Sequence, residues 1–214
     1  MNPDFALSLH FNCSGDFNAD DLVKLARNIG ARAVSFSQQT AAITTACTKY
    51  TIHELASHPD AQPLTTAAIH TMLHRRQQVL TTCFTVPVTS DGQLTADTQQ
   101  VLAEINRWMH LFGHAFNEGM PTTLTANTGC MFENRHFSYQ KYLVIAQPWP
   151  HQIQINGLTQ APDRIELIAD RTPLTFSFAA GVLTLTVPAA LTLPWQVIRI
   201  QGHRPEDDWE ETTF

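Results

Sequence analysis

The first part of the chain alternates short apolar runs with a helical pattern. Residues 5–11 (FALSLHF) and 31–37 (ARAVSFS) are mostly apolar runs of the kind that form buried strands. A helix is predicted between them, from the N-cap residue Asn18 to Gly30, a residue type that commonly ends helices. Its buried stripe has helical spacing and consists of Leu22, Leu25, Ala26 and Ile29. Two strands joined by a helix predict a βαβ unit with parallel strands and a right-handed crossover.

The same alternation continues to about residue 120. A capping-box pattern at Thr51 and Glu54 predicts a short helix before His58. A longer helical pattern begins at a proline and covers residues 63–78. Residues 79–88 (VLTTCFTVPV) are predicted to form the third strand of the same sheet.

Period-2 runs replace helical patterns after about residue 121. The last predicted helix begins after Thr95 and ends at Gly113. Six short runs punctuated by proline and glycine follow: KYLVIA, HQIQI, RIELIA, LTFSF, VLTLTV and WQVIRI. This spacing predicts an antiparallel β-sandwich. The expected organisation is an α/β domain over 1–120, a β-sandwich domain over 121–204 and an acidic tail over 205–214.

Composition excludes several classes of function. Hydrophobic residues make up 43% of the chain and charged residues 15%, which indicates a packed fold and not a disordered chain. No apolar run is long enough to cross a bilayer, and the opening segment lacks the features of an export signal, so we expect a cytoplasmic protein without a membrane partner. The net charge is −6 and the 13 Lys and Arg form no basic stripe, which argues against nucleic acid as a partner.

Cysteine and histidine spacing gives no support for a metal centre. The four cysteines are far apart, without a CxxC pair, and fit free buried thiols in a reducing compartment: Cys13, Cys47, Cys83 and Cys130. Two histidine pairs have i,i+4 spacing on predicted helices: His70 with His74, and His110 with His114. Neither pair has an adjacent glutamate or an identifiable third ligand. We therefore predict no metal and no cofactor.

Three segments resemble glycoside hydrolase family 29, the α-L-fucosidases. Residues 79–122 are similar to the family's last barrel strand, its Asp-Gly turn and the helix that follows, with matching positions at Asp91, Gly92, Trp108, Gly113 and Ala115. Residues 141–158 and 164–200 resemble the family's β-sandwich, including a strand that ends at Pro188. Residues 5–11 are similar to the first barrel strand, where a histidine at the position of His10 contributes to the sugar pocket.

The resemblance implies an α/β plus all-β fold. It predicts a shortened, three-stranded parallel βαβ layer, the remnant of a TIM-like barrel, followed by the antiparallel β-sandwich. In the family, the nucleophilic aspartate sits on the fourth barrel strand and the acid/base carboxylate comes from a later strand or loop, and both lie in a stretch that this sequence lacks. The chain also departs from the family after its second strand, where it has Ser37, Gln38, Gln39 and Thr40 in place of two histidines and an aspartate, and at residues 112–114.

Most carboxylates of the α/β part have structural explanations. A retaining glycosidase needs two carboxyl groups about 5–5.5 Å apart. First helical turns, capping patterns, turns and solvated surface account for Asp20, Asp21, Glu54, Asp60, Asp91, Asp97 and Glu104. Asp4, Asp16 and Glu118 lack such a reason, and nothing in the pattern pairs them, so no catalytic residue is assigned.

We therefore expect a fucosidase-related protein that lacks the catalytic carboxylates and binds a sugar or an interaction partner. The candidate ligand-binding residues lie near the carboxyl ends of predicted strands: His10, Asn12, Gln38, Gln39 and Thr85. A histidine held within the core is the competing interpretation of His10. The alternative function is an active α-L-fucosidase-type hydrolase whose site is completed across a dimer or by a partner chain, and a structural partner of a full-length hydrolase is a third.

An opened barrel sheet needs a cover. Phe5, Leu7, Val34 and Phe36 are expected to face the former barrel interior, which makes that face apolar. Either the helix over 63–78 lies on that face, opposite the first helix, or a second subunit covers it. We favour a homodimer through the opened sheet face. Such a dimer is compatible with a helix over 63–78 on the same face.

Overall fold

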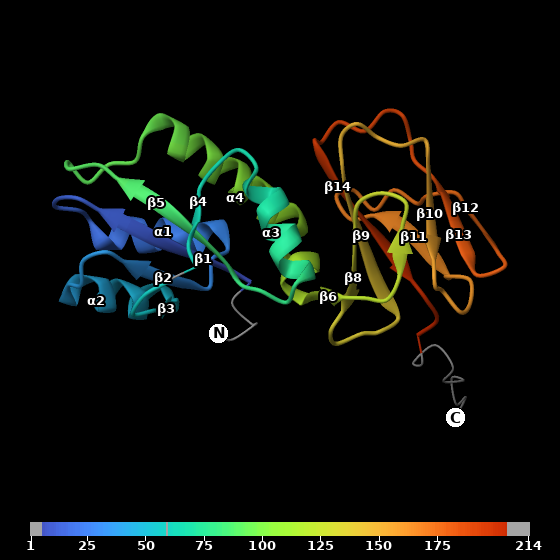
Figure 1. The fold of residues 1–214 in the computed structure, drawn as a ribbon, viewed down its shortest axis with the longest axis horizontal. Helices are drawn as coiled ribbons and strands as arrows, with labels where there is room; N and C mark the ends of the chain where they lie inside the picture. The colour runs from blue at the N-terminus through green and yellow to red at the C-terminus, as the bar shows by residue number, and fades with distance from the viewer. Residues whose placement is uncertain (1–5, 59, 205–214) are drawn as a thin grey trace, which may run out of the picture. The chain divides into compact units, whose positions relative to one another are not determined.

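The computed structural model describes residues 6–58 and 60–204, and the chain divides into two units between Asn117 and Glu118 (Figure 1). The first unit combines helices with a parallel sheet, and the second unit contains two antiparallel sheets. This arrangement agrees with the α/β plus all-β class expected from the sequence. The predicted acidic tail (205–214), Asp4 and Phe5 lie outside the described residues.

The first unit is built on a five-stranded parallel sheet. Its elements are β1 (Leu7–Cys13), α1 (Ala19–Ile29), β2 (Ala33–Phe36), α2 (Ala41–Tyr50), β3 (His53–Glu54), β4 (Gln62–Pro63), α3 (Ala68–Gln77), β5 (Thr82–Val88) and α4 (Ala96–Glu118). The strand order is β3-β2-β1-β5-β4, and every neighbouring pair is parallel. The central order β2-β1-β5 is the one expected if the three predicted strands are the first, second and last strands of a barrel, which are neighbours, but the predicted number of three strands is wrong. The two edge strands have two residues each, too few to produce a periodic signal.

Local capping explains why α1 lies where the pattern predicts it. The Asn18 side chain accepts hydrogen bonds from the backbone N–H groups of Asp20 and Asp21, which satisfies donors at the start of the helix. Gly30 ends the helix with φ of 92°, a left-handed conformation that glycine adopts without steric cost. The boundaries predicted for this helix are therefore confirmed.

Three other helix boundaries differ from the prediction. The second helix, α2, precedes Thr51 instead of following it, because Thr51 is the C-cap residue with φ of 51° and Glu54 belongs to β3. Helix α3 begins at Ala68, since residues 62–63 form β4. Helix α4 continues through Gly113 to Glu118, where its apolar stripe is extended by edge-on contacts of Trp108 with Phe112 and Phe116.

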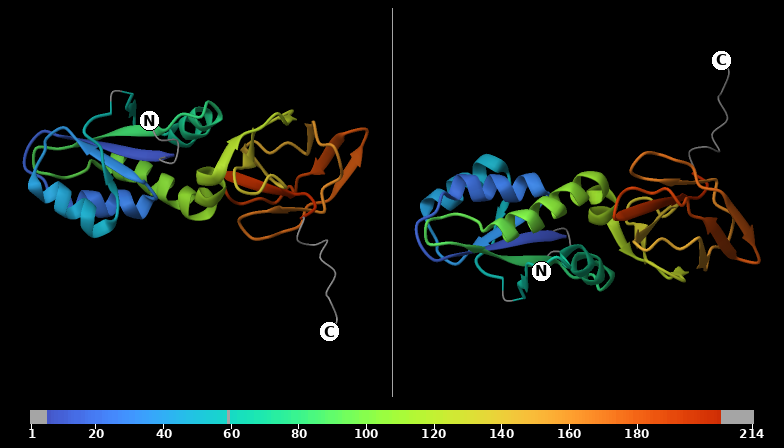
Figure 2. Two further views of the ribbon diagram at one scale, coloured as in Figure 1. Left: turned by 90° about the horizontal axis from the view of Figure 1, so that it is seen from below. Right: turned by 90° about the horizontal axis from the view of Figure 1, so that it is seen from above.

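The two faces of the parallel sheet differ in polarity. Paired residues of neighbouring parallel strands share a face, so the register assigns each side chain to one side. One face is mostly apolar: apart from Thr82, which pairs with Leu7, it carries the buried residues Leu7, Leu9, Phe11, Val34, Phe36, Phe84 and Val86. The opposite face, here called the polar face, carries Ser8, His10, Asn12, Ser35, Cys83 and Thr85. Two views of the ribbon show α1, α2 and α4 on one side of the sheet, and α3 with the β3–β4 connection on the other (Figure 2).

This polarity corrects one expectation. Leu7, Val34 and Phe36 do not lie on the same side as His10, because side chains alternate along a strand and these residues pair on the apolar face. His58, from the β3–β4 connection, lies against Ser8 on the polar face, so the apolar face is the one toward α1, α2 and α4. The apolar character expected of the opened face is therefore not found in the described residues, and the homodimer through that face stays a prediction.

The second unit is a pair of antiparallel sheets. Its strands are β6 (Gly119–Pro121), β7 (Thr125–Ala126), β8 (Cys130–Asn134), β9 (Gln140–Ala146), β10 (Gln152–Asn156), β11 (Arg164–Leu167), β12 (Phe176–Ala179), β13 (Val182–Thr186) and β14 (Trp195–Gln201). One sheet has the order β12-β13-β10-β7 and the other β11-β14-β9-β8-β6. All six runs predicted as strands are strands. The pattern did not reveal β6, β7 and β8.

The core of the second unit forms between its two sheets. Alternate residues of facing strands supply it: Leu143 and Ile145 on β9, Ile198 and Ile200 on β14, Ile153 and Ile155 on β10, and Leu183 and Leu185 on β13. Their side chains are 0–1% exposed, so the two sheets pack as a sandwich. Among residues 6–58 and 60–204, no helix combines the length and apolar character needed to cross a bilayer.

Candidate functional site

Three side chains form a row across the centre of the polar face. The register places His10 of β1 between Ser35 of β2 and Thr85 of β5. Two of the three, His10 and Thr85, are half-buried, whereas Ser35 is fully buried. The sequence prediction named His10 and Thr85, and the structure brings them to neighbouring positions.

Ser35 fixes the orientation of the His10 ring. The His10 Nδ1 atom lies 2.9 Å from the Ser35 Oγ atom, within hydrogen-bond distance. Burial lowers the pKa of His10 below its ordinary value of 6.5, because a partly desolvated site disfavours the charged imidazolium. The ring is thus neutral at pH 7, with one nitrogen held by Ser35 and the other able to meet a ligand hydroxyl as donor or acceptor.

The other predicted ligand residues lie around the carboxyl end of β1. Asn12 is exposed and follows His10 on the same face. The Gln38 side-chain amide donates a hydrogen bond of 3.2 Å to the Cys13 carbonyl oxygen. The Ser37 hydroxyl accepts a hydrogen bond from the Cys13 N–H and donates one to the same Cys13 carbonyl oxygen. Gln39 is exposed, and no contact ties it to this group. The structure therefore places Asn12 and Gln38 at the carboxyl end of β1 and His10 and Thr85 in the middle of their strands, and it leaves the role of Gln39 open.

His58 is the residue that sequence reasoning missed. It lies in the connection between β3 and β4, which carries no periodic pattern, yet it is 7% exposed and sits on the polar face. Its Nε2 atom lies 3.2 Å from Ser8 Oγ, while its Nδ1 atom is buried without a hydrogen-bond partner in the described part of the chain. Burial is the main cause that lowers the pKa of His58, and the positive charge that His10 carries when protonated lowers it further.

Cys83 completes the buried part of this face but is not a nucleophile. It is paired with Ser8 in the β1–β5 register and is fully buried. Burial raises the pKa of the Cys83 thiol to about 11. A thiol that stays protonated at neutral pH and does not reach solvent is inert, which agrees with the structural role expected for the cysteines.

Four of the eight carboxylates in the described part of the first unit accept hydrogen bonds from neighbouring side chains. Asp20 accepts from Lys49 and Tyr50 at 2.7 Å each, Asp21 accepts from the Asn18 side chain, Glu54 from Thr44, and Asp91 from Thr89. Glu118 lies 3.9 Å from His136, and both belong to the second unit. Asp16 and Asp60 are exposed. No cluster of three or more metal-ligating side chains occurs within the described ranges.

The polar face is expected to make the stability of the protein depend on pH. Both His10 and His58 have pKa values below 6.5 in the folded protein, so the unfolded chain binds protons more readily. The stabilisation of the folded protein by the neutral forms of His10 and His58 is therefore present above pH 6.5. It is lost as the pH falls below that value. Urea unfolding of a His58→Gln variant should show a smaller loss of stability between pH 7 and pH 5 than the wild type.

A matched variant separates this effect from general acid sensitivity. His151 is exposed on the second unit, and His151→Gln should reproduce the wild-type pH dependence. Equal pH dependence in the wild type and in the His58→Gln variant would contradict the role assigned to His58.

Comparisons with known proteins identify the fold. No protein-family model matches the chain, and no curated protein matches it. A family 29 α-L-fucosidase structure from Bacteroides thetaiotaomicron matches with a TM-score of 0.77 at 9% identity, over 93% of this chain and 93% of that chain. An α-fucosidase from Thermotoga maritima in complex with fucose matches with a TM-score of 0.74 at 7% identity, over 92% of this chain and 96% of that chain.

A third match extends over only part of its enzyme. The α-L-fucosidase isoenzyme 1 of Paenibacillus thiaminolyticus has a TM-score of 0.57 at 15% identity, and the match covers 92% of this chain but 58% of that chain. At these identities the likeness establishes a shared fold. The chain therefore has a fold related to that of the family 29 α-L-fucosidases.

Proposed function

We propose that the protein is a non-catalytic relative of the family 29 α-L-fucosidases that binds a hydroxylated ligand, in particular a sugar, at the polar face. The observation that carries the proposal is the row of Ser35, His10 and Thr85, in which a half-buried, neutral imidazole is held at a fixed angle. Such a group offers directed hydrogen bonds to sugar hydroxyls without the cost of desolvating a charge.

The fold supports a sugar as the ligand. The Thermotoga maritima structure with this fold was solved in complex with fucose. In parallel α/β sheets, ligands bind beyond the carboxyl ends of the strands. Asn12 lies two residues from His10 toward that end, and Gln38 contacts Cys13 at the end of β1. We assign His10, Asn12, Gln38 and Thr85 to this site, with Gln39 as a peripheral member.

The carboxylates support the absence of hydrolysis. Breaking a glycosidic bond requires an acid and a nucleophile that face each other across it. In the described part of the first unit, Asp20, Asp21, Glu54 and Asp91 are bound by neighbouring side chains. We propose that the first unit is a shortened barrel that lacks the strands on which the catalytic pair resides.

Calorimetric titration with L-fucose tests the binding site. The wild type is expected to bind with a Kd in the millimolar range, near −4 kcal/mol. His10→Ala should weaken binding about tenfold, because one directed hydrogen bond is lost, whereas His151→Ala on the second unit should have no effect. Identical heats for wild type and His10→Ala would contradict the assignment.

Incubation with a chromogenic α-L-fucoside tests the absence of catalysis. No turnover above background is expected from the purified chain. Turnover that disappears when a single aspartate or glutamate is replaced would instead favour an active hydrolase, with its site completed in a dimer or by a partner chain.

A further inference from the structure

The inner side of the β-sandwich changes from apolar to charged at one end. Along β9, Leu143 and Ile145 point into the core between the sheets, and Lys141 is the next residue on the same side. On the neighbouring β8, Met131 points into the core and Glu133 follows it. Two charged residues therefore occupy positions where the alternation of a sandwich strand would place apolar side chains.

These two residues form a close ion pair. The Lys141 Nζ atom lies 2.6 Å from Glu133 Oε2, and the same ammonium donates to the Ser138 carbonyl oxygen. The Lys141 side chain is only 16% exposed. An ammonium has three protons, and these two contacts leave one proton for a further acceptor.

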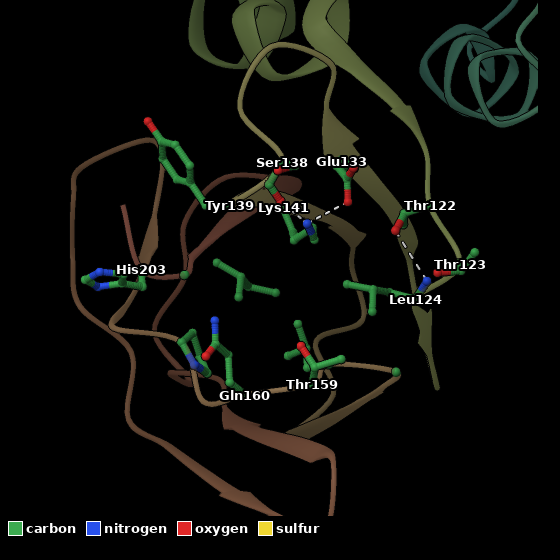
Figure 3. Close-up of a pocket in the computed structure, with 15 residues that line it drawn as sticks. Thr122, Thr123, Leu124, Glu133, Ser138, Tyr139, Lys141, Thr159, Gln160 and His203 are labelled. Carbon is green, nitrogen blue, oxygen red and sulfur yellow. Dashed lines mark hydrogen bonds and ion pairs between the residues drawn. The ribbon is translucent and has the colours of Figure 1, made fainter. Parts of the chain in front are cut away.

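A cavity opens beside the pair. Its volume is about 430 Å³, within the range of small-molecule sites, and all of its lining residues belong to the second unit. Figure 3 shows Lys141 and Glu133 on one side of the cavity, with Thr159 and Gln160 on the opposite side. Leu124 and Ile200 also line the cavity and contribute apolar surface.

The lining favours a neutral ligand with several hydroxyl groups. Glu133 compensates the charge of Lys141, so the site has no excess charge to attract an anion. The carboxylate accepts hydrogen bonds, the ammonium donates them, and the threonine hydroxyl and glutamine amide do both. Thr122 Oγ already accepts from the Leu124 N–H at 3.3 Å, so its own hydroxyl hydrogen can point into the cavity. Alternating hydroxyl groups and C–H faces of a sugar ring match such a mixed surface.

We infer that this cavity is a second binding site, for a single saccharide residue, separate from the polar face of the parallel sheet. A lysine at the end of a β-sandwich that serves only to be solvated would extend its ammonium group into water. Lys141 is instead withdrawn from solvent and held by two acceptors at an inward position. The inference does not depend on the function proposed for the first unit.

Chemical-shift mapping of the full chain tests this site. L-Fucose, D-galactose and D-glucose are each added at about 50 mM, well above a millimolar Kd. At least one sugar is expected to shift the backbone amides of Gly157 and Gly202, which line the cavity. The amides of His10 and Thr85 report on the other site in the same spectra, so failure of one site is distinguishable from failure of the other.

Two variants make the test specific. The double variant Lys141→Met with Glu133→Leu replaces the ion pair by apolar residues, a change that preserves or raises the stability of many proteins; it should fold and weaken sugar binding at least tenfold. Gln160→Ala changes an exposed side chain and should weaken it several-fold, whereas Gln152→Ala, which is exposed and outside the cavity, should not. The absence of sugar-induced shifts at Gly157 and Gly202, shifts caused only by inorganic phosphate, or unchanged binding in the double variant would overturn the inference.

Discussion

Replacing Glu166 with glutamine is expected to lower the free energy of unfolding by about 3 kcal/mol. The Glu166 side chain is fully buried and contacts three arginines: Arg164 at 2.6 Å, Arg171 at 2.9 Å, and Arg199, which lies opposite Glu166 in the β11–β14 register. Without the carboxylate, three positive charges remain close together with no counter-charge among them. Urea unfolding at pH 7 measures the difference.

The same cluster predicts how the difference changes with pH. Burial by itself raises the pKa of the Glu166 carboxyl, but the hydrogen bond from Arg171 and the charges of Arg199 and Arg164 outweigh burial and hold the pKa below 4.5. A lowered pKa stabilises the fold above the unfolded value, and the stabilisation is lost as the pH falls through the folded value. The stabilities of wild type and Glu166→Gln should therefore converge in strong acid.

A substitution of the same chemical type at a partly exposed position is the control. Glu104 lies on α4, and Glu104→Gln should change the stability by less than about 0.5 kcal/mol at pH 7. A Glu166→Gln variant as stable as Glu104→Gln would show that the fold does not need the Glu166 carboxylate to compensate the charges of the three arginines.

Gly129→Ala is the second substitution with a large expected cost, about 3 kcal/mol, from a strained backbone and an overpacked contact. Gly129 lies just before β8 with φ of 78°, in the left-handed region. A Cβ atom there would come within 2.4 Å of the Val144 carbonyl oxygen and 2.8 Å of the Ile145 side chain. The carbonyl belongs to β9, so the strand itself would have to move.

Gly181→Ala separates the two contributions. Gly181 has nearly the same backbone conformation, with φ of 77°, but a Cβ atom there would meet only the Leu158 carbonyl oxygen at 3.6 Å, an ordinary contact. This variant should lose about 1 kcal/mol, the cost of the left-handed conformation alone. Urea unfolding of both variants gives the comparison. Equal losses in the free energy of unfolding would mean that β9 moves away from the added Cβ atom without a measurable loss of stability.

The sequence predicts elements well where a local signal and the packing agree. The strands of the sandwich alternate apolar and polar side chains, and Asn18 and Gly30 mark the ends of α1, so these elements were predicted. The capping-box pattern at Thr51 failed because Thr51 ends a helix with a left-handed backbone. A side chain that fits an N-cap reveals nothing about the conformation that its own backbone adopts.

The candidate site was predictable only in part. Parallel strands place residues near their carboxyl ends at one edge of a sheet, which is why His10 and Thr85 were named together. The parity of side chains along β1 and β2 also points to Ser35 as a neighbour of His10. His58 could not be predicted, because its place depends on the path of a connection without periodicity. Leu7 was assigned to the wrong face because the alternation of side chains along β1 was not applied to Leu7 and His10 together.

The connection from β3 to β4 has little length to spare. Glu54 and Gln62 stand on opposite edges of the sheet, four strand spacings apart, or roughly 19 Å. The eight residue steps between them reach at most about 26–29 Å. Removing three residues would leave a tether of about 17 Å, shorter than the gap that it must bridge. Insertions in the β3–β4 connection are therefore compatible with the sheet. A deletion of three residues would prevent β3 or β4 from pairing at its edge of the sheet.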